Sequence, residues 1–350
     1  MKEKKFFKLI IGSIMGLLLI IGSIMIIVDP YFHYHKPLGI LKYRLVNQRY
    51  INDGIIRNFN YNGMIIGTSM TENFRTSQFD KIFSVKSIKV PFAGGSFKEI
   101  SQNIERGLER NRKIQTILRG LDYGMIQSNS ERMRYDFYPE YLYDDDILND
   151  YKYLLNKELI LKGLGGVILN TLKKREMNFD SYSSWRDRKT GKEVIISNYK
   201  RKIEKKEITN LSENEIKMIK ESIEKNVLET SKKYPDVKFI YFITPYSIVY
   251  WDSINQNGEI LKQLEAEKIM IEMILEVPNI ELYSFFNNYE LITNLDNYTD
   301  AGHYSYKIND KILEWISQGK YRLTKDNYKE YLESNKEFYL NYDYDKIFEK

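Results

Sequence analysis

The chain has 350 residues, enough for one large hydrophobic core or two smaller ones, and its composition is that of a globular protein. Cysteine is absent, which excludes disulfides, a thiolate nucleophile and cysteine-ligated metals. The formal charge is +5, but the first eight residues, with four lysines and one glutamate, account for +3, so the balanced remainder gives no sign of nucleic-acid binding.

Residues 9–28 carry no charged side chain and are long enough to cross a bilayer as one helix. The lysines that precede this run place residues 1–8 in the cytoplasm by the positive-inside rule, and the chain after residue 28 outside it. A cleaved signal peptide is the alternative, but its apolar region is shorter and ends in small residues. This run ends in Ile-Ile-Val-Asp-Pro, so we predict an uncleaved, single-pass membrane anchor.

The segment DPYFHYH at residues 29–35 follows the anchor and carries aromatic side chains suited to a membrane interface. His33 and His35 form an H-x-H pair, which is a metal-binding spacing, but no further histidine or cysteine lies nearby to complete a site. We therefore interpret both as packed or interfacial imidazoles and expect no metal and no other cofactor. Residues 38–61 are predicted to form a helical connector.

A short apolar run at residues 63–67 predicts a buried central strand, because it is brief, β-branched and without alternation. Gly67 at its end allows a tight turn. Ser69 then lies at the carboxyl edge of the sheet, where open α/β folds place their ligands, and its hydroxyl is a nucleophile if a base reaches it. The alternative is a strand-to-helix turn in which Ser69 or Thr71 caps the helix.

Strands and amphipathic helices alternate from there to residue 122. We expect a helical stretch to about 83, a strand at 87–91, a glycine turn, a helix from the capping box at Ser96 to about 111, and a strand at 113–122 that ends in a loop. This alternation predicts an α/β fold with a mostly parallel sheet and helices on both faces.

Residues 123–210 break this rhythm, and a segment of that length is predicted to be an insertion over one edge of the sheet. Its aromatic and charged side chains, Trp185 among them, either line a substrate groove or pack on the surface. Regular elements are expected again at 212–233 (helix), 237–244 (strand), 258–276 (helix), 280–284 (strand) and 306–317 (helix), followed by a Tyr- and Lys-rich tail at 321–350.

His303 is the one histidine outside the juxtamembrane pair, and it stands after the last predicted strand and before the last core helix. In a parallel sheet this position is on the same edge as Ser69. Asp300 lies three residues earlier, so one loop can hold its carboxylate against the imidazole while the other ring nitrogen takes the serine proton. The alternative is a capping aspartate and a structural histidine at a helix start.

The order of these motifs resembles that of the SGNH/GDSL hydrolase superfamily. The pieces are, in chain order, Gly67-Thr68-Ser69, Gly94-Gly95 and Asp300-Ala301-Gly302-His303. With the anchor, DPYFHYH, GTSMTENF and DAGHYS, the chain is most similar to the membrane-anchored branch that includes D-alanyl-teichoic-acid transfer proteins and polysaccharide O-acetylation partners. The resemblance implies a three-layer, flavodoxin-like sandwich, with an extracytoplasmic domain at 29–320.

The resemblance also implies a role for each matching residue. Ser69 would be the nucleophile, His303 the general base and acid, and Asp300 the carboxylate that orients it. The backbone N–H groups of Ser69 and of Gly94 or Gly95 would form the oxyanion hole, which supplies much of the rate in such enzymes.

Two positions depart from the family pattern. Thr68 stands where the first motif usually has aspartate. The motif after the third strand reads Gly120-Leu121-Asp122-Tyr123 where the family has Gly-x-Asn-Asp, and an ionised Asp122 would repel an oxyanion. Either Asp122 is turned away or protonated, or another group such as Asn73 supplies the third donor. Asn73, Asp122 and Tyr246 are therefore our candidate substrate-side residues.

The resemblance leads us to expect an extracytoplasmic serine acyl-transfer enzyme, an esterase or an O-acyltransferase, acting on esters of cell-envelope glycopolymers. A multispanning membrane O-acyltransferase is the implied partner. The alternatives are a catalytically inactive envelope-binding or scaffold protein of the same fold, suggested by Asp122, and a lipolytic enzyme, suggested by the nearby membrane.

Overall fold

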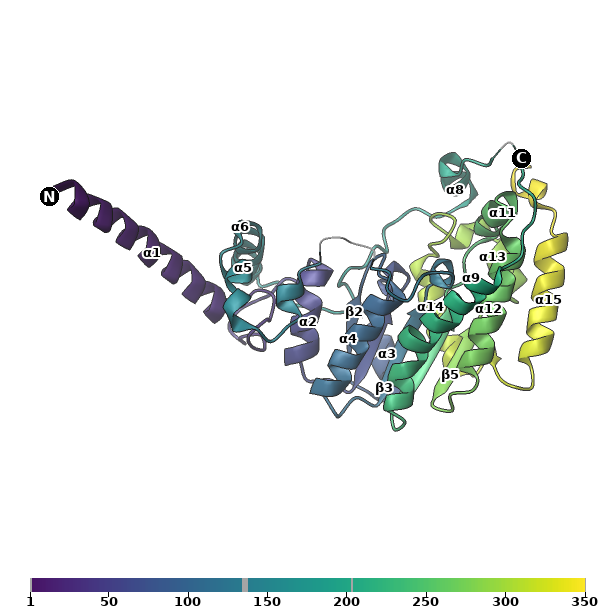
Figure 1. The fold of residues 1–350 in the computed structure, drawn as a ribbon, viewed down its shortest axis with the longest axis horizontal. Coiled ribbons are helices and arrows are strands. Elements are labelled where there is room, and N and C mark those ends of the chain that lie inside the picture. Colours follow the sequence, from purple (N-terminus) through teal and green to yellow (C-terminus); the bar gives the residue numbers. More distant parts are fainter. Residues whose placement is uncertain (1, 134–137, 203, 350) are drawn as a thin grey trace. The chain divides into compact units, whose positions relative to one another are not determined.

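The structure is a computed structural model that describes residues 2–133, 138–202 and 204–349. The chain divides into two compact units, which are drawn in sequence colours in Figure 1. The first unit consists of Met1–Asn60 and Tyr135–Phe179, and the second of Tyr61–Arg134 and Asp180–Lys350.

The first unit is helical and begins with α1 (Lys2–Val28), which contains the predicted anchor. Among the described residues, α1 is the one helix long and apolar enough to cross a membrane. Just after it, the Asp29 carboxylate accepts the backbone N–H groups of residues 33, 34 and 35 at 2.7–2.9 Å, which folds DPYFHYH into a tight turn. The helices that follow in this unit are α2 (Gln48–Asn58), α5 (Tyr151–Leu154), α6 (Lys157–Leu159), η5 (Ile160–Leu164) and α7 (Gly165–Leu172).

The second unit is built on a six-stranded sheet with the order β2-β1-β3-β4-β5-β6. The strands are β1 (Gly63–Gly67), β2 (Ser87–Pro91), β3 (Thr116–Leu121), β4 (Lys238–Ile243), β5 (Ile280–Ser284) and β6 (Arg322–Leu323). The first five are parallel, and β6 pairs antiparallel with β5. Strands β1, β2 and β3 are buried along their whole length, as expected when helices cover both faces of a parallel sheet.

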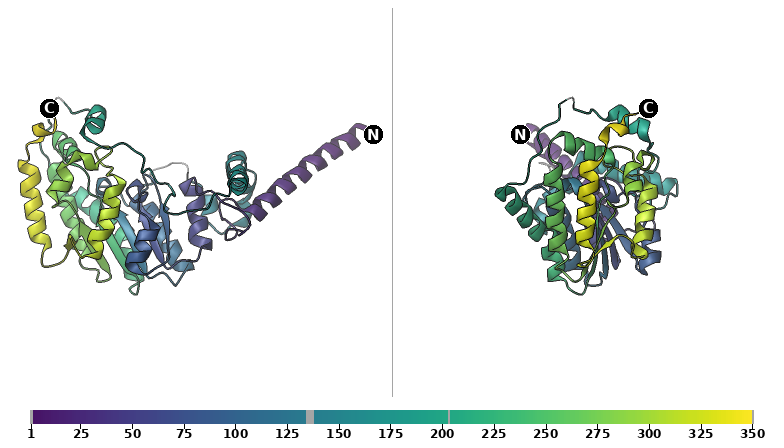
Figure 2. Two further views of the ribbon diagram at one scale, coloured as in Figure 1. Left: turned by 180° about the vertical axis from the view of Figure 1, so that it is seen from behind. Right: turned by 90° about the vertical axis from the view of Figure 1, so that its right-hand side faces the viewer.

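Helices flank this sheet on both sides (Figure 2). In chain order, the α-helices of the second unit that the structure describes are α3 (Thr76–Phe83), α4 (Phe97–Arg110), α8 (Lys192–Asn198), α9 (Glu213–Ile223), α10 (Glu229–Lys233), α11 (Ile248–Gln256), α12 (Ile260–Ile274), α13 (Tyr289–Thr293), α14 (Tyr306–Ser317) and α15 (Tyr328–Asn341). Helix α3 contacts α14, whereas α12 contacts both α9 and α15. The predicted mixed α/β architecture with a mostly parallel central sheet is confirmed.

The strand order 2-1-3-4-5 is that of flavodoxin-like sheets. In such a sheet the chain runs to one side after β1 and to the other after β3, and ligands bind beyond the carboxyl ends of these two neighbouring strands. The structure therefore directs attention to the residues that follow Gly67 and Leu121.

Several predicted elements coincide with the structure, and several differ. The strands at 63–67, 87–91 and 280–284 and the helix at 306–317 have the predicted bounds. The capping box at Ser212 is present, with the Glu215 side chain bonded back to the Ser212 N–H. Helix α11 and strand β6 were not predicted, because the first follows a proline-containing turn and the second has two residues.

The segment 123–210, predicted to be an insertion, connects β3 to β4, which are neighbours in the middle of the sheet. Its described residues contain no strand, and residues 135–179 belong to the first compact unit rather than to the second. The units therefore divide the chain differently from the expected domain at 29–320.

Candidate active site

The turn after β1 presents Ser69, which starts the short helix η1 (Ser69–Thr71). The φ of Gly67 lies outside the left-handed region, so close packing is what requires a glycine in this turn. A Cβ on Gly67 would lie 2.6 Å from the Thr71 methyl group, and one on Gly120 would lie 2.9 Å from it. Thr71 thus packs into the space that the two glycines leave, and holds the turn against β3.

His303 and Asp300 stand on one tight loop before α14. A β-bridge between Tyr298 and Tyr304 closes this loop, with a bond of 2.8 Å from the Thr299 N–H to the His303 carbonyl. The Asp300 carboxylate also accepts the backbone N–H of His303 at 2.8 Å. This short loop therefore holds the Asp300 carboxylate against the His303 imidazole, as we predicted from their three-residue spacing.

The structure brings together the three residues that the sequence singled out as a triad. Ser69 Oγ lies 2.8 Å from His303 Nε2, and Asp300 Oδ2 lies 2.9 Å from His303 Nδ1. With the Nδ1 proton directed at Asp300, Nε2 is left to accept the Ser69 hydroxyl. The His303 side chain is 31% exposed and that of Asp300 45%, so the group is open to solvent on one side.

Burial and neighbouring charges shift the pKa values of both His303 and Asp300. Burial lowers the pKa of His303, but the hydrogen bond and charge of Asp300, helped by the charge of Asp122, outweigh burial and raise it above its ordinary value. Burial raises the pKa of Asp300, but the bonds from His303 outweigh burial and lower it. Asp300 therefore stays ionised, and stabilises the imidazolium that forms when His303 takes a proton.

Two buried side chains connect the turn at Ser69 to the part of the chain that carries His303. The Tyr304 hydroxyl and the Asn309 amide both donate to the Met70 carbonyl, each at 3.0 Å. Met70 follows Ser69 and Tyr304 follows His303, so these bonds help to set the distance between Ser69 and His303, which are 234 residues apart in the chain. Sequence reasoning missed both residues, although their positions beside the motifs were a signal.

Asp122 follows β3 at the same edge, and both of its carboxylate oxygens are bonded. Oδ2 accepts the Thr68 hydroxyl at 2.7 Å, and Oδ1 accepts the Tyr246 hydroxyl and, at 3.3 Å, the Gly124 N–H. Thr68, the residue before Ser69, is thus the donor and Asp122 the acceptor of a hydrogen bond between the ends of β1 and β3. Tyr246 lies beside the histidine loop, with ring atoms 3.5 Å from the position of a Cβ on Gly302.

The glycine turn after β2 is at this edge as well, because the Phe92 N–H bonds the Gly67 carbonyl at 2.8 Å. Gly94 has φ +62°, a conformation that favours glycine. The expectation for Gly95 is wrong: its N–H donates to the Phe92 carbonyl at 2.7 Å and is used up by the turn.

Asn73 is not a substrate-side residue in this structure. It is fully buried, and its side-chain oxygen accepts the Trp185 N–H at 2.9 Å and the Ser184 hydroxyl at 3.2 Å. Its amide nitrogen has no partner among the described residues and is closed off from solvent. Asn73 therefore binds a part of the chain that is distant in sequence to the loop that follows Ser69.

That distant part, residues 180–188, is called the returning segment here. Asp180 accepts the Thr76 hydroxyl at 2.9 Å, and Trp185 packs edge-on against the His303 ring, with centroids 5.7 Å apart. The Arg188 guanidinium stacks on Trp185 at 5.0 Å, and its charge acts on the pKa of His303 in the lowering direction. Trp185 of the segment 123–210 is therefore in contact with the His303 ring.

A buried lysine supports the same loop. Lys89 on β2 is fully buried, and its ammonium group donates to the carbonyls of Glu72 at 2.5 Å and Phe74 at 3.0 Å. Burial lowers the pKa of Lys89 to about 7. These two hydrogen bonds fix the backbone on both sides of Asn73. They therefore also support the loop against which the returning segment packs.

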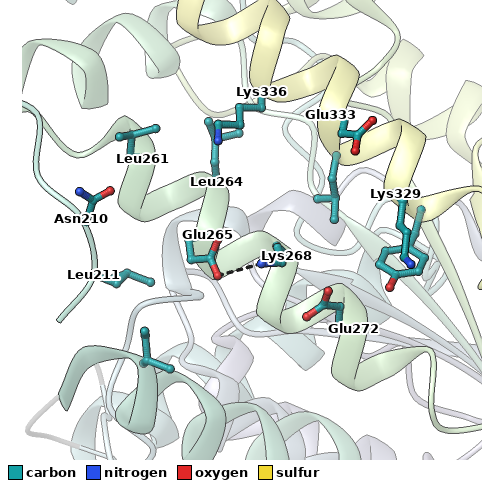
Figure 3. A pocket seen from close by; sticks show the side chains of 13 residues that line it. Asn210, Leu211, Leu261, Leu264, Glu265, Lys268, Glu272, Lys329, Glu333 and Lys336 are labelled. Carbon is teal, nitrogen blue, oxygen red and sulfur yellow. Dashed lines mark hydrogen bonds and ion pairs between the residues drawn. The ribbon is translucent and has the colours of Figure 1, made fainter. Parts of the chain in front are cut away.

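Neither the juxtamembrane His33 nor the hollow beside α12 and α15 includes a residue of the triad. His33 is buried and bonded to Asp150 at 3.0 Å, and the described residues contain no group of three metal ligands. A hollow of about 580 Å³ lies beside α12 and α15, away from the triad (Figure 3). Its charged lining is balanced, with three glutamates and three lysines: Glu265, Glu272, Glu333, Lys268, Lys329 and Lys336.

Comparison of the chain with models of known protein families and with curated proteins finds no match. The argument for function consequently rests on the geometry at the edge of the sheet.

Proposed function

We propose that this protein is a membrane-tethered serine acyl-transfer enzyme of the SGNH/GDSL type that acts outside the cytoplasm on esters of cell-envelope glycopolymers. The observation that carries the proposal is the 2.8 Å contact between Ser69 Oγ and His303 Nε2, with Asp300 on the other ring nitrogen. Support comes also from the place of Ser69 and Asp122 beyond β1 and β3, where flavodoxin-like sheets bind ligands.

In the first step, Ser69 Oγ attacks the acyl carbonyl carbon and its proton passes to His303 Nε2. The carbonyl electron pair becomes an oxyanion, and Asp300 stabilises the imidazolium. His303 then gives the proton to the leaving oxygen as its bond to the acyl carbon breaks. The product of this half-reaction is an ester on Ser69.

In the second step, an acceptor hydroxyl or water attacks the Ser69 ester and gives its proton to His303. The proton then returns to Ser69 as the acyl group leaves. Transfer and hydrolysis differ only in the acceptor, and the partly exposed His303 leaves room for either. A multispanning membrane acyltransferase that supplies or receives the acyl group is part of this proposal.

The oxyanion would be stabilised by the backbone N–H groups of Ser69 and Gly94, each worth on the order of 10²–10³ in rate. Asp122 need not oppose it, because its carboxylate is bonded to Thr68 and Tyr246. Arg188 beside Trp185 supplies a positive charge that suits an anionic glycopolymer.

The test is covalent labelling of the full chain in detergent with a fluorophosphonate probe, read by mass spectrometry. We expect one adduct, on Ser69, since a base within hydrogen-bond distance activates this hydroxyl. Ser69→Ala and His303→Ala should abolish labelling. Ser317→Ala, which removes an exposed hydroxyl on α14, should not change it.

Absence of labelling in a protein whose circular dichroism shows it to be folded would contradict the enzyme and favour the scaffold alternative. Labelling that persists in His303→Ala would show that another group is the base.

A further inference from the structure

We propose that residues Ile147–Leu172 of the first unit are embedded in the lipid bilayer beside α1, as a second membrane-bound element of the chain. This inference rests on the proposed membrane anchoring and is independent of the acyl-transfer chemistry. The partner we assign to this surface is the bilayer itself, and not a second protein.

Outside α1, the segment exposes more large apolar side chains than any other part of the described chain. Outside α1, eleven large hydrophobic side chains are exposed among the described residues, and eight of these lie between 147 and 172. Leu148 is 82% exposed, Leu161 63% and Leu169 55%. A surface of this kind is costly in water and marks a site of interaction with a membrane or a protein.

An apolar groove joins the segment to α1. It has a volume of about 310 Å³, and one wall consists of side chains of α1 and the other of side chains of α5 and the residue after it. The lining residues are Met15, Leu18, Leu19, Gly22, Ser23, Ile26, Tyr151, Leu154 and Leu155. Helix α1 also contacts η5. The exposed apolar surface of the segment is therefore continuous with that of the anchor.

The position of the groove along α1 sets its depth. Leu18 lies ten residues before Val28, the end of the helix, which corresponds to about 15 Å at 1.5 Å per residue. This is about half of a 30 Å hydrocarbon core. If α1 spans the bilayer, side chains that share a groove with Leu18 and Ile26 lie at hydrocarbon depth. Helices are able to do so, because their backbone groups are bonded internally.

A buried polar network fixes the segment to the membrane-proximal end of α1. The Tyr153 hydroxyl donates to Asp29 at 2.9 Å, and Asp150 accepts from His33 and from the Tyr34 hydroxyl, each at 3.0 Å. Asp29 follows the last residue of α1. The segment therefore keeps its position relative to the anchor.

Close packing at a glycine strengthens this link. A Cβ on Gly163 would lie 2.8 Å from the Tyr31 ring and 2.9 Å from Pro30, so only glycine allows η5 to approach the juxtamembrane turn.

The charged side chains of the segment fit an interfacial position. Lys152, Lys157 and Lys162 are exposed, and Lys162 is paired with Glu158 at 2.6 Å. Long lysine side chains can lay their methylene groups along apolar surface and place the ammonium group among anionic lipid headgroups. The groove itself would hold a lipid acyl chain.

The absence of cysteine allows a direct test. The full chain, in nanodiscs containing anionic phospholipid, would carry one nitroxide label on Leu148→Cys, Leu161→Cys or Leu169→Cys. Collision with oxygen, which concentrates in hydrocarbon, is compared with collision with a water-soluble nickel chelate. Leu18→Cys on α1 is the membrane reference, and Ile208→Cys, an exposed apolar position of the second unit, is the control.

We expect the three segment labels to resemble Leu18→Cys, with more oxygen than nickel collisions, and Ile208→Cys to show the reverse. Frequent nickel collisions at the segment, with Leu18→Cys still in hydrocarbon, would overturn the proposal and leave the anchor intact. Shielding from both reagents would also overturn it, because a protein would then cover the surface. Nickel collisions at Leu18→Cys as well would refute the anchor, and with it this proposal.

Discussion

The sequence left open whether the Asp122 carboxylate faces an oxyanion, and the structure shows which groups that carboxylate contacts. An aspartate at an oxyanion would be unfavourable, but this carboxylate accepts hydroxyl groups from Thr68 and Tyr246. Thr68, the residue before Ser69, and Asp122, the residue after β3, are bonded to each other. A hydroxyl at 68 suits a carboxylate at 122 as donor to acceptor.

The charge of Asp122 gives a prediction for the pH dependence. It raises the pKa of His303, which accepts a proton only when neutral, so activity falls on the acid side of that pKa. Asp122→Asn removes the charge and should lower the pKa of His303. The acid limb of the fluorophosphonate labelling rate should then move to lower pH.

Tyr246→Phe is the control for this prediction. It removes the hydroxyl bonded to Asp122 but no charge, and should leave the acid limb in place. An acid limb at the same pH in wild type and Asp122→Asn would contradict the electrostatic role.

At the scale of elements, the returning segment shows how the insertion contributes to the site. Asn73 binds its backbone at Trp185, and Arg186 pairs with Asp310 on α14 at 2.9 Å. Lys89 fixes the loop beneath it. The wall beside His303 is therefore assembled from β2, the loop after η1, α14 and a segment that is far from all three in sequence.

Helices α12 and α15 pack through a buried carboxyl group that gives a second prediction about pH. Glu267 on α12 accepts the Tyr331 hydroxyl of α15 at 2.5 Å and the Tyr123 hydroxyl at 2.8 Å. Burial raises its pKa from 4.5 to about 7, against the lowering effect of these two bonds. Between these values the folded protein keeps a proton that the unfolded chain releases, so stability falls as pH rises through this window.

Glu267→Gln should remove this loss. We expect the free energy of unfolding of the wild type to decline relative to that of Glu267→Gln as the pH rises from 4.5 to about 7, measured by denaturant unfolding. Glu265→Gln, a partly exposed position on the same helix, should decline in parallel with the wild type. Parallel curves for wild type and Glu267→Gln would contradict the raised pKa.

At the scale of the whole molecule, the triad residues and the apolar helix α1 belong to different units. Ser69, Asp122, Trp185, Asp300 and His303 all belong to the second unit. The apolar helix α1 and the exposed apolar segment belong to the first. The contacts of the triad therefore do not depend on α1.

This division predicts that a chain beginning at Asp29 keeps its reactive serine. Labelling of Ser69 by the fluorophosphonate probe should proceed at a rate similar to that of the full chain when both are measured in the same detergent. Its Ser69→Ala variant should remain unlabelled. Loss of labelling in a truncated chain with unchanged circular dichroism would show that α1 is needed for the site.

Local patterns in the sequence were sufficient for most elements and for the three triad residues. Strands such as 63–67 and 280–284 and the helix at 306–317 are encoded by neighbouring residues, because hydrophobic periodicity and capping are local properties. His303 stood out since no other histidine lies outside the juxtamembrane pair, and Asp300 shares its loop.

Tertiary structure alone decided the rest. The turning of Asp122 toward Thr68 and Tyr246 and the burial of Asn73 beneath Trp185 depend on how backbones approach one another in space. The contacts of Asp122 with Tyr246 and of Asn73 with Trp185 join residues more than a hundred positions apart, and a single sequence carries no direct signal for them. The sequence by itself determined which chemical groups are available, whereas packing determined which of them meet at the edge of the sheet.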